Sequence, residues 1–299
     1  MKLYYHDHFV LPLPEGHRFP MEKYARLRER VANDVQFAPI EFLVPEQATL
    51  DELCLAHNPL YVQRFLQGNM SEKEMRRIGF PWTPQLVERA RRSVGGTIAA
   101  CRAALQEGAS ANLAGGTHHA YAEHGEGYCV FNDSAVAARA MQVDGLARRI
   151  AILDCDVHQG NGTAAILAKD PSVFTFSIHG EKNFPFHKEQ SDLDIALPDG
   201  TGDDLYLARL EVGVRQTLEQ AKADLVIYLA GADPYAGDRL GRLALSKKGL
   251  LERDTLVVRH CQLRGLPVAI AMAGGYARQV EDTVDIHFQT ISTLARLFA

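Results

Sequence analysis

The sequence predicts a single α/β domain in which a parallel sheet lies between two layers of helices, a three-layer α/β/α architecture. From about residue 110 onward, short apolar runs alternate with amphipathic stretches of helical length. Such an alternation is typical of parallel sheets covered by helices. The 299 residues are 46% hydrophobic, enough for one large core, and no repeat or linker divides them. We therefore treat residues 1–299 as one domain.

The predicted strands are mostly runs of Ile, Val, Leu and Phe with little alternation, so we expect them to be buried on both faces. In order, they cover Asn112–Ala114, Arg149–Leu153, Val173–Ile178, Leu225–Leu229 and Val268–Met272. Two segments near the N-terminus, Lys2–Tyr5 and Glu41–Val44, are predicted as additional strands.

Amphipathic periodicity predicts the helices between these strands. They cover Asp133–Val143, Thr163–Lys169, Asp203–Lys222, Lys247–Arg264 and Glu281–Phe298. The first hundred residues are more helical, with helices predicted over Met21–Val31 and Pro84–Gln106 and loops over Leu11–Pro20 and Gly79–Trp82. Pro84 lies near a predicted helix start, where proline is tolerated.

The bulk composition excludes several classes of function. The net charge is −5, so no basic excess indicates nucleic-acid or anionic-membrane binding. No apolar run is long enough to span a bilayer, and the N-terminus lacks the features of a signal peptide. The cysteines are odd in number, widely spread and without a C-x-x-C pair, which indicates free thiols in a reducing cytoplasm. They are Cys54, Cys101, Cys129, Cys155 and Cys261.

Polar residues cluster where the predicted strands end. The segments are Gly115–Ala120 with two histidines, Asp154–Gly162, Ser177–His179, Gly231–Pro234 and Ala273–Tyr276. In open parallel sheets the ligand crevice lies outside the carboxyl ends of the strands. The sequence therefore predicts one polar site assembled from five strand ends.

The run Asp154-x-Asp156-x-His158 is the most informative of these segments. In an extended chain alternate residues face the same way, so the three side chains are expected to point into one pocket. Two carboxylates and an imidazole suit Zn²⁺ or a similar divalent ion, and Asp233 could supply a further carboxylate. Plain alternatives remain at this point: the run could be a solvated loop, and Asp233 could cap a helix before Pro234.

The same segments resemble the histone deacetylase superfamily, which includes acetoin-utilisation proteins and acetylpolyamine amidohydrolases. The matching stretches follow the family's order and spacing along nearly the whole chain. They are GGTHHA (115–120), GYCVFNDSAVA (127–137), ILDCDVHQGNGT (152–163), FSIH (176–179), LAGADPYAGD (229–238) and MAGGY (272–276), preceded by HNPLYVQRFL (57–66) and IGFPW (78–82). The resemblance implies the arginase–deacetylase fold, with a parallel sheet of about eight strands.

The resemblance also implies the residues of the reaction site. One catalytic Zn²⁺ is expected on Asp156, His158 and Asp233. His118 and His119 match the tandem active-site histidines, and Tyr276 matches the tyrosine that polarises the substrate carbonyl. Asp154 matches the carboxylate that pairs with the first histidine.

Two further sets of residues follow from the resemblance alone. A monovalent cation, usually K⁺, is expected on Asp154, Asp156, His158, Ser177 and Ile178. The acyl-lysine tunnel is expected to be lined by Tyr128, Gly127, Phe184 and Gly275.

Two positions depart from the family pattern. Asn161 stands where many members have an aspartate beside the second histidine, so we count it among the catalytic residues. Because an amide cannot stabilise an imidazolium as a carboxylate can, we expect a lower pKa for His119 and a neutral general base. Tyr128 replaces a residue that is usually Phe and adds a hydroxyl to the tunnel wall.

The expected activity is removal of an acyl group, acetyl or longer, from acyl-lysine of a peptide or protein or from a related acylated amine. The alternatives are an acetylpolyamine or other small-molecule deacetylase, a binuclear Mn²⁺ hydrolase like the arginases, and a weakly active acyl-lysine-binding protein. A nucleotide-binding protein is disfavoured, because no glycine-rich phosphate motif follows a strand. The oligomeric state stays open.

Selectivity is expected to lie in the rim loops Pro12–Pro20, Gly79–Thr83 and Gly180–Gln190. Three polar residues there could meet a cationic substrate or could be plain solvated side chains. They are Glu181, His187 and Glu189.

Overall fold

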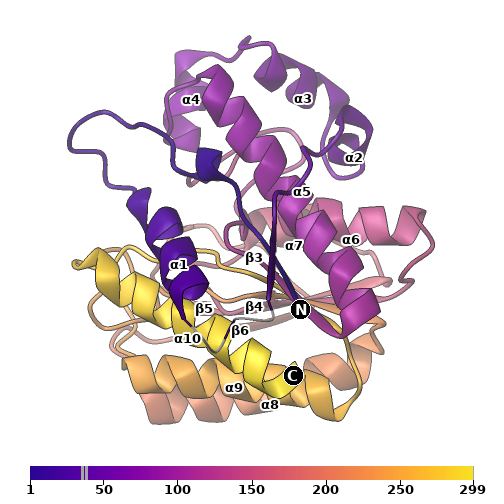
Figure 1. The fold of residues 1–299 in the computed structure, drawn as a ribbon, viewed down its shortest axis with the longest axis vertical. Helices are drawn as coiled ribbons and strands as arrows, with labels where there is room; N and C mark the ends of the chain where they lie inside the picture. Colours follow the sequence, from indigo (N-terminus) through magenta and orange to yellow (C-terminus); the bar gives the residue numbers. More distant parts are fainter. Residues whose placement is uncertain (35–36, 38–39, 299) are drawn as a thin grey trace.

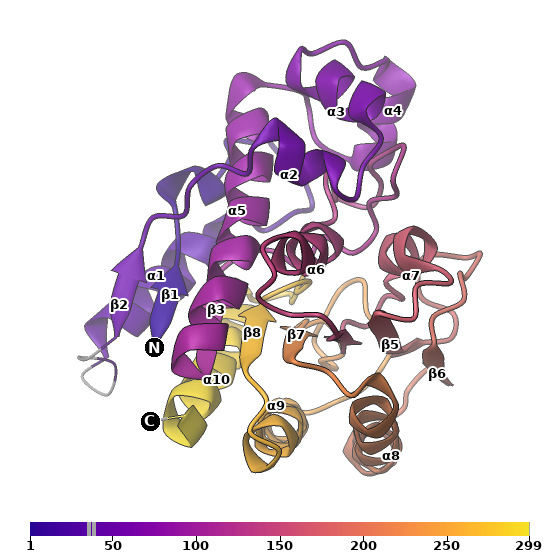
Figure 2. The ribbon, with the colours of Figure 1, turned by 90° about the vertical axis from the view of Figure 1, so that its right-hand side faces the viewer.

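The computed structural model describes residues 1–34, 37 and 40–298 and shows a single domain built on one all-parallel sheet (Figures 1 and 2). The predicted three-layer α/β/α architecture is confirmed. Its eight strands are β1 (Lys2–Tyr4), β2 (Glu41–Leu43), β3 (Ala109–Asn112), β4 (Ile150–Asp154), β5 (Val173–Gly180), β6 (Leu193–Leu197), β7 (Leu225–Leu229) and β8 (Val268–Ala271).

The strand order places the ends that carry the site next to one another. The sheet runs β2-β1-β3-β8-β7-β4-β5-β6, so β3, β8, β7, β4 and β5 are consecutive neighbours. All of these pairings are parallel. The polar segments after these five strands therefore emerge at one edge of the sheet.

Two layers of helices cover the sheet. One layer holds α8 (Asp203–Ala221), α9 (Lys247–Leu263), α10 (Val280–Phe298) and α1 (Glu22–Asn33), which pack in that order (Figure 2). The other holds α5 (Pro84–Glu107), α6 (Asp133–Val143) and α7 (Asn161–Leu167). The central strands β4, β7 and β8 are buried along their whole length, as their apolar runs predict.

Three short helices lie beside the N-terminal end of α5, at the top of Figure 1: α2 (Leu50–Cys54), α3 (Pro59–Leu66) and α4 (Glu72–Ile78). Thr49 and Ser71 begin α2 and α4 with capping boxes, in which the side chain of a glutamate three residues later bonds back to the cap. A 3₁₀ turn, Asp7–Phe9, follows β1.

Two predicted boundaries were wrong, and one strand was missed. Strand β3 covers Ala109–Asn112 instead of Asn112–Ala114, because the small residues at its start form no apolar run that would mark it. Helix α7 begins two residues before the predicted Thr163. The edge strand β6 was missed, since its half-exposed residues form no continuous apolar run.

The five cysteines are free, as the sequence predicts. In the described part of the chain, no helix is both long and apolar enough to cross a bilayer.

Candidate functional site

The two neighbouring strands β4 and β7 bring together three side chains of the types that bind metal ions. Asp156 and His158 follow β4, and Asp233 follows β7. One ligand atom from each lies within 4.8 Å of the others, and all three residues are buried. The Nδ1 atom of His158 lies 2.9 Å from Asp156 Oδ1 and 3.2 Å from Asp233 Oδ2. Two buried carboxylates that share one ring nitrogen place negative charge in the interior, which a cation would compensate.

The remaining carboxylate oxygens are held by backbone amides. Val157 N–H donates to Asp233 Oδ1 (2.9 Å), and Gly274 N–H donates to Asp156 Oδ2 (2.8 Å). Within the described residues, Asp233 Oδ2 is buried and receives no hydrogen bond. A Cβ at Gly274 would lie 2.0 Å from that oxygen, so only glycine fits there. The donor set and the orphaned oxygen fit a divalent ion with one imidazole and two carboxylates.

Asp154 does not join this set, which corrects the expectation that three alternate residues point into one pocket. Strand β4 ends at Asp154, and the chain then turns. The turn is fixed because Asp154 Oδ1 accepts the N–H of Asp156, and Asp156 Oδ1 accepts that of His158. Asp154 instead reaches the first histidine.

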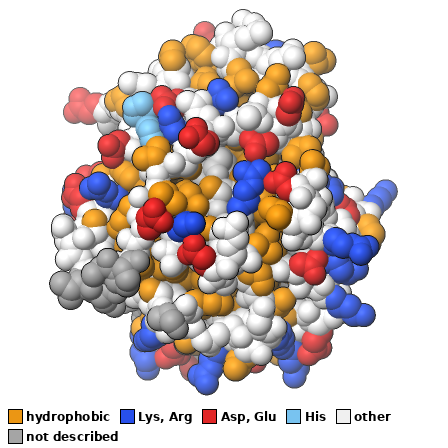
Figure 3. Space-filling model, turned by 45° about the vertical axis from the view of Figure 1, so that its right-hand side comes forward, with side chains coloured by type: hydrophobic (Ala, Val, Ile, Leu, Met, Phe, Trp, Pro, Cys, Tyr) orange, Lys and Arg blue, Asp and Glu red, His pale blue; other side chains and the backbone are white. Residues whose placement is uncertain are grey.

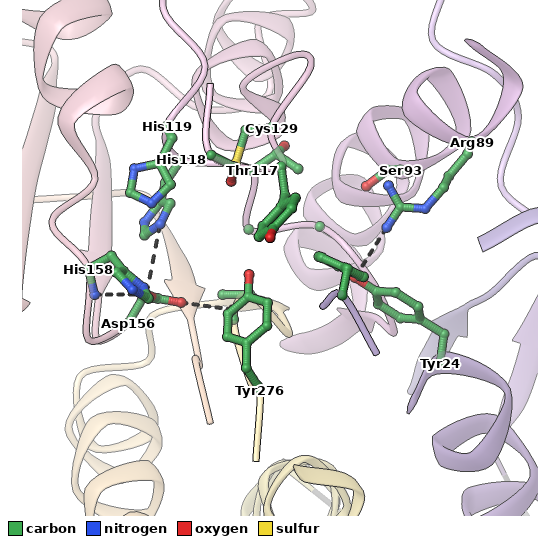
Figure 4. Close-up of a pocket in the computed structure, with 17 residues that line it drawn as sticks. Tyr24, Arg89, Ser93, Thr117, His118, His119, Cys129, Asp156, His158 and Tyr276 are labelled. Atoms are coloured by element: carbon green, nitrogen blue, oxygen red, sulfur yellow. Dashed lines mark hydrogen bonds and ion pairs between the residues drawn. The ribbon is translucent and has the colours of Figure 1, made fainter. Parts of the chain in front are cut away.

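His118 and His119 follow β3 and lie side by side, with ring centroids 4.1 Å apart (Figure 4). His118 Nδ1 lies 2.6 Å from Asp154 Oδ2, and its Nε2 lies 3.8 Å from Asp156 Oδ1. The ring is thus held between two carboxylates. Burial opposes a charge on His118, but these carboxylates outweigh it and raise its pKa to about 9.

His119 has a neutral partner instead. Its Nδ1 lies 2.6 Å from Asn161 Oδ1. The amide orientation is fixed by its other end, because Asn161 Nδ2 donates to Tyr121 Oη (3.1 Å) and to Glu126 Oε1 (3.4 Å). Asn161 Oδ1 can only accept, so Nδ1 of His119 carries the proton and Nε2 keeps its lone pair.

The pKa values of the two histidines are therefore shifted in opposite directions. Burial lowers the pKa of His119 well below its ordinary value, and the positive charges of His118 and His158 add to this effect. The hydrogen bond with Asn161 acts in the opposite direction, so the lower pKa expected relative to an aspartate at this position stays a prediction. Two adjacent titratable groups with opposite shifts are the usual arrangement of an acid and a base.

Tyr276 lies beyond β8, on the other side of the cavity from the histidines, and its hydroxyl points into the cavity (Figure 4). Its backbone N–H donates to Asp238 Oδ2 at 2.6 Å, and its ring centroid lies 6.4 Å from that of His158. Burial raises its pKa well above the ordinary value, and Asp233 and Asp156 reinforce this. The phenol is thus a proton-bearing donor.

Two connected cavities flank these residues. The outer cleft, of about 400 Å³, has Gly127, Tyr128 and Phe184 in its lining. The Phe184 ring meets His119 edge-on at 4.9 Å, and a Cβ at Gly127 would lie 2.7 Å from the His119 ring. The inner cavity, of about 30 Å³, shares His119, Tyr128 and Tyr276 with the cleft. Gly275 was expected to line the tunnel, but it lines neither cavity in the described chain. Its neighbour Gly274 lines the inner cavity.

The residues assigned to a monovalent cation lie on two adjacent strands and in the turn that follows one of them. Asp154 of β4 is paired in register with Ser177 of β5, and Ile178 follows directly. The Ser177 hydroxyl lies 3.0 Å from His179 Nδ1. Three of the five residues thus belong to this strand pair, and Asp156 and His158 follow in the turn.

Two residues that support the site were not singled out from the sequence. Arg253 of α9 is fully buried, and its guanidinium donates to the carbonyl of Cys155, directly before Asp156, and to that of Gly231, two residues before Asp233. Asp254 balances its charge at 2.8 Å. Asp238 lies within the motif LAGADPYAGD, but its hydrogen bond with the Tyr276 backbone amide forms only in the folded loop. An arginine in an amphipathic helix carries no signal that separates it from a surface residue.

The rim residues Glu181, His187 and Glu189 are exposed and do not line the outer cleft. The Tyr121 hydroxyl donates to Glu189 Oε1 at 3.1 Å.

Comparisons with known proteins agree with this geometry. The histone deacetylase domain model matches residues 17–291. An uncharacterized protein of Picosynechococcus sp. is 47% identical over 283 residues, covering 95% of this chain and 94% of its own. Histone deacetylase 2 of Arabidopsis thaliana is 28% identical, covering 94% and 76%. The crystal structure of the HDA15 HD domain shares the fold, with a TM-score of 0.82 at 20% identity over 98% of this chain and 90% of that one.

Proposed function

The chain belongs to the histone deacetylase family, and we propose that it is a zinc-dependent amidohydrolase that removes a short acyl group from acyl-lysine or a related acylated amine. Family membership supports deacetylase chemistry in general. The observation that carries the finer proposal is the placement of one three-ligand metal cluster, a histidine pair and a tyrosine around a single cavity. Three protein ligands leave a coordination position open for water or substrate, as in catalytic zinc sites.

Asp156, His158 and Asp233 would hold the zinc. The fit rests on their converging ligand atoms and on the orphaned Oδ2 of Asp233. When bound, zinc supplies Lewis acidity toward the amide carbonyl and lowers the pKa of bound water. The described residues offer one such cluster at this site, which favours a single ion over a binuclear arginase-like centre.

The chain's own groups supply proton transfer and charge stabilisation. The lone pair on His119 Nε2 makes it the general base for the attacking water. His118, which Asp154 favours in its charged form, is suited to protonate the leaving amine. The Tyr276 hydroxyl donates a hydrogen bond to the oxyanion, a contribution of typically about 3–4 kcal/mol.

The proposal of a short acyl group rests on the size of the inner cavity. About 30 Å³ accommodates roughly two water molecules, since about 10–15 Å³ suffices for one. The far wall is formed by the aromatic side chains of Phe19 and Tyr24. An acetyl group fits beside the metal cluster, whereas a long acyl chain would have to displace these rings.

A potassium ion at Asp154, Asp156, His158, Ser177 and Ile178 remains part of the proposal. It is supported by the paired register of Asp154 and Ser177. Activity should therefore depend on K⁺ concentration when sodium is replaced at constant ionic strength.

Acyl-lysine peptides that differ only in acyl length test the proposed function. Zinc-loaded protein should hydrolyse the acetyl peptide fastest, a chelator should abolish the activity, and added zinc should restore it. Binding of acetyl peptides without any turnover would support the alternative of an acyl-lysine-binding protein. Faster hydrolysis of a long-chain acyl peptide would contradict the short-acyl part alone.

A further inference from the structure

The rim of the outer cleft carries an unusual concentration of positive charge. Four cationic side chains line it: Arg76 and Arg77 at the end of α4, Lys182 in the loop after β5, and Arg242 in the loop after β7. No carboxylate lines the cleft within the described part of the chain. The whole chain has a net charge of −5, so this local excess opposes the overall charge.

On the face drawn in Figure 3, acidic and basic side chains are interspersed. The rim cations therefore stand out as a single-sign cluster around an opening, an arrangement that concentrates ligands of opposite charge.

Two of the four cations have acidic partners outside the cleft. Arg76 pairs with Glu72 one turn earlier in α4 at 3.2 Å, and Arg242 pairs with Asp199 at 3.2 Å. For Arg77 and Lys182, the described residues provide neither an ion pair nor a side-chain hydrogen bond, and both side chains are exposed. These two charges are available to a bound ligand.

The backbone of each of these segments is fixed against the tunnel. The carbonyl of Arg77 accepts the N–H of Gly127 at 3.1 Å, which ties the end of α4 to the tunnel wall. Next to Lys182, Asn183 donates to the Leu240 carbonyl (2.8 Å) and accepts the N–H of Arg242 (3.2 Å). The rim cations are thus held where the substrate enters.

We propose that the substrate carries a carboxylate close to the acylated amine, specifically that it is an acyl-lysine flanked by acidic residues. The inference rests on the proposed deacylase function and selects among its substrates. An acylated polyamine keeps a cationic amine that would meet Arg77 and Lys182 at the rim, and a lysine-rich peptide would meet them in the same way. These cationic substrates would be repelled by the rim cations, whereas acidic flanking residues would be attracted to them.

The test compares acetyl-lysine peptides with Glu, Gln or Lys on both sides of the modified residue, together with an acetylated polyamine. At low ionic strength kcat/KM should be about tenfold higher with Glu than with Lys flanks, because two exposed charge pairs each contribute modestly. The ratio should fall toward one at high salt. The Arg77→Glu/Lys182→Glu variant should reverse the preference.

A matched control is Arg209→Glu/Lys248→Glu. These residues lie on α8 and α9, are exposed and do not line the cleft. Their substitution changes the net charge by the same amount as that of the rim variant. This variant should keep the acidic preference. Equal or faster hydrolysis of the Lys-flanked peptide or of the polyamine at low salt would overturn the proposal, as would an unchanged preference in the rim variant.

Peptide binding is measured by fluorescence anisotropy on the zinc-loaded protein. It separates the acidic substrate preference from the proposed deacylase function. If no peptide is hydrolysed, the proposed function fails. Tighter binding of the Glu-flanked peptide, reversed in the rim variant, would still support the acidic preference. Equal binding of all three peptides would overturn it as well.

Discussion

The inner site and its rim are built in opposite ways. The inner site places three buried carboxylates, Asp154, Asp156 and Asp233, among histidines, and backbone amides hold their oxygens. The rim places exposed cations on the end of α4 and on two loops. Charges in the buried region interact strongly because water screens them little, whereas those on the rim are screened.

This difference assigns separate tasks to the two regions. In the proposed reaction, the buried groups set which bond is broken, and the exposed groups influence which molecule enters. Substitutions inside should therefore change turnover by orders of magnitude, and substitutions on the rim should change selectivity by about tenfold or less.

The largest effect is expected from Asp233→Ala in the inner site. Removing one of three ligands should abolish stable zinc binding and reduce turnover by roughly a thousandfold or more, because several kcal/mol of metal catalysis are lost. Elemental analysis and kcat/KM measure the two effects. Asp199→Ala, which removes an exposed carboxylate, serves as the control. Full zinc occupancy in the Asp233 variant would exclude it as a ligand.

Tyr276→Phe should reduce kcat by about 10²–10³-fold, the loss typical of one oxyanion donor, while zinc content stays unchanged. The substitution removes the hydroxyl alone, and the hydrogen bond from the Tyr276 backbone to Asp238 is kept. Tyr235→Phe removes a partly exposed hydroxyl nearby and should have little effect. Unchanged kcat/KM after Tyr276→Phe would remove the tyrosine from the mechanism.

Asn161→Asp should change the pH dependence of the reaction. A carboxylate beside His119 stabilises its imidazolium, so the pKa of His119 should rise by about 1–3 units. Because the base acts in its neutral form, the acidic limb of the pH profile of kcat/KM should move to higher pH. Asn69→Asp, at an exposed position that does not line the cleft, is the matched control. If the acidic limb of the Asn161 variant stays in place, His119 is not the titrating base.

The smallest effect is expected from aromatic substitutions that compare the two regions directly. Phe184 packs against His119, whereas Phe186 is 81% exposed at the cleft. Phe184→Ala should lower kcat/KM by at least tenfold through loss of the tunnel wall, and Phe186→Ala by less than about threefold. Kinetics with one acetyl-lysine peptide measure both. A larger effect for Phe186 would place the selective contacts outside the tunnel.

The sequence by itself determined the fold class and most of the elements. Buried parallel strands such as Leu225–Leu229 and capped helices such as Asp133–Val143 have local patterns that identify them with the bounds observed. The carboxyl-end rule then placed the polar segments at one edge, and their residue types indicated a metal. The chemistry of a buried site is local enough to be visible in short motifs.

Only the tertiary structure decided which side chains touch. Asp154 turned from the metal cluster to His118 because β4 ends there, and Arg253 reached the loops under the metal ligands from a helix nearly one hundred residues away. The positive rim likewise combines three segments that are remote in sequence. Contacts of this kind depend on the packing of elements that are distant in sequence. The residues on either side of a position therefore do not predict them.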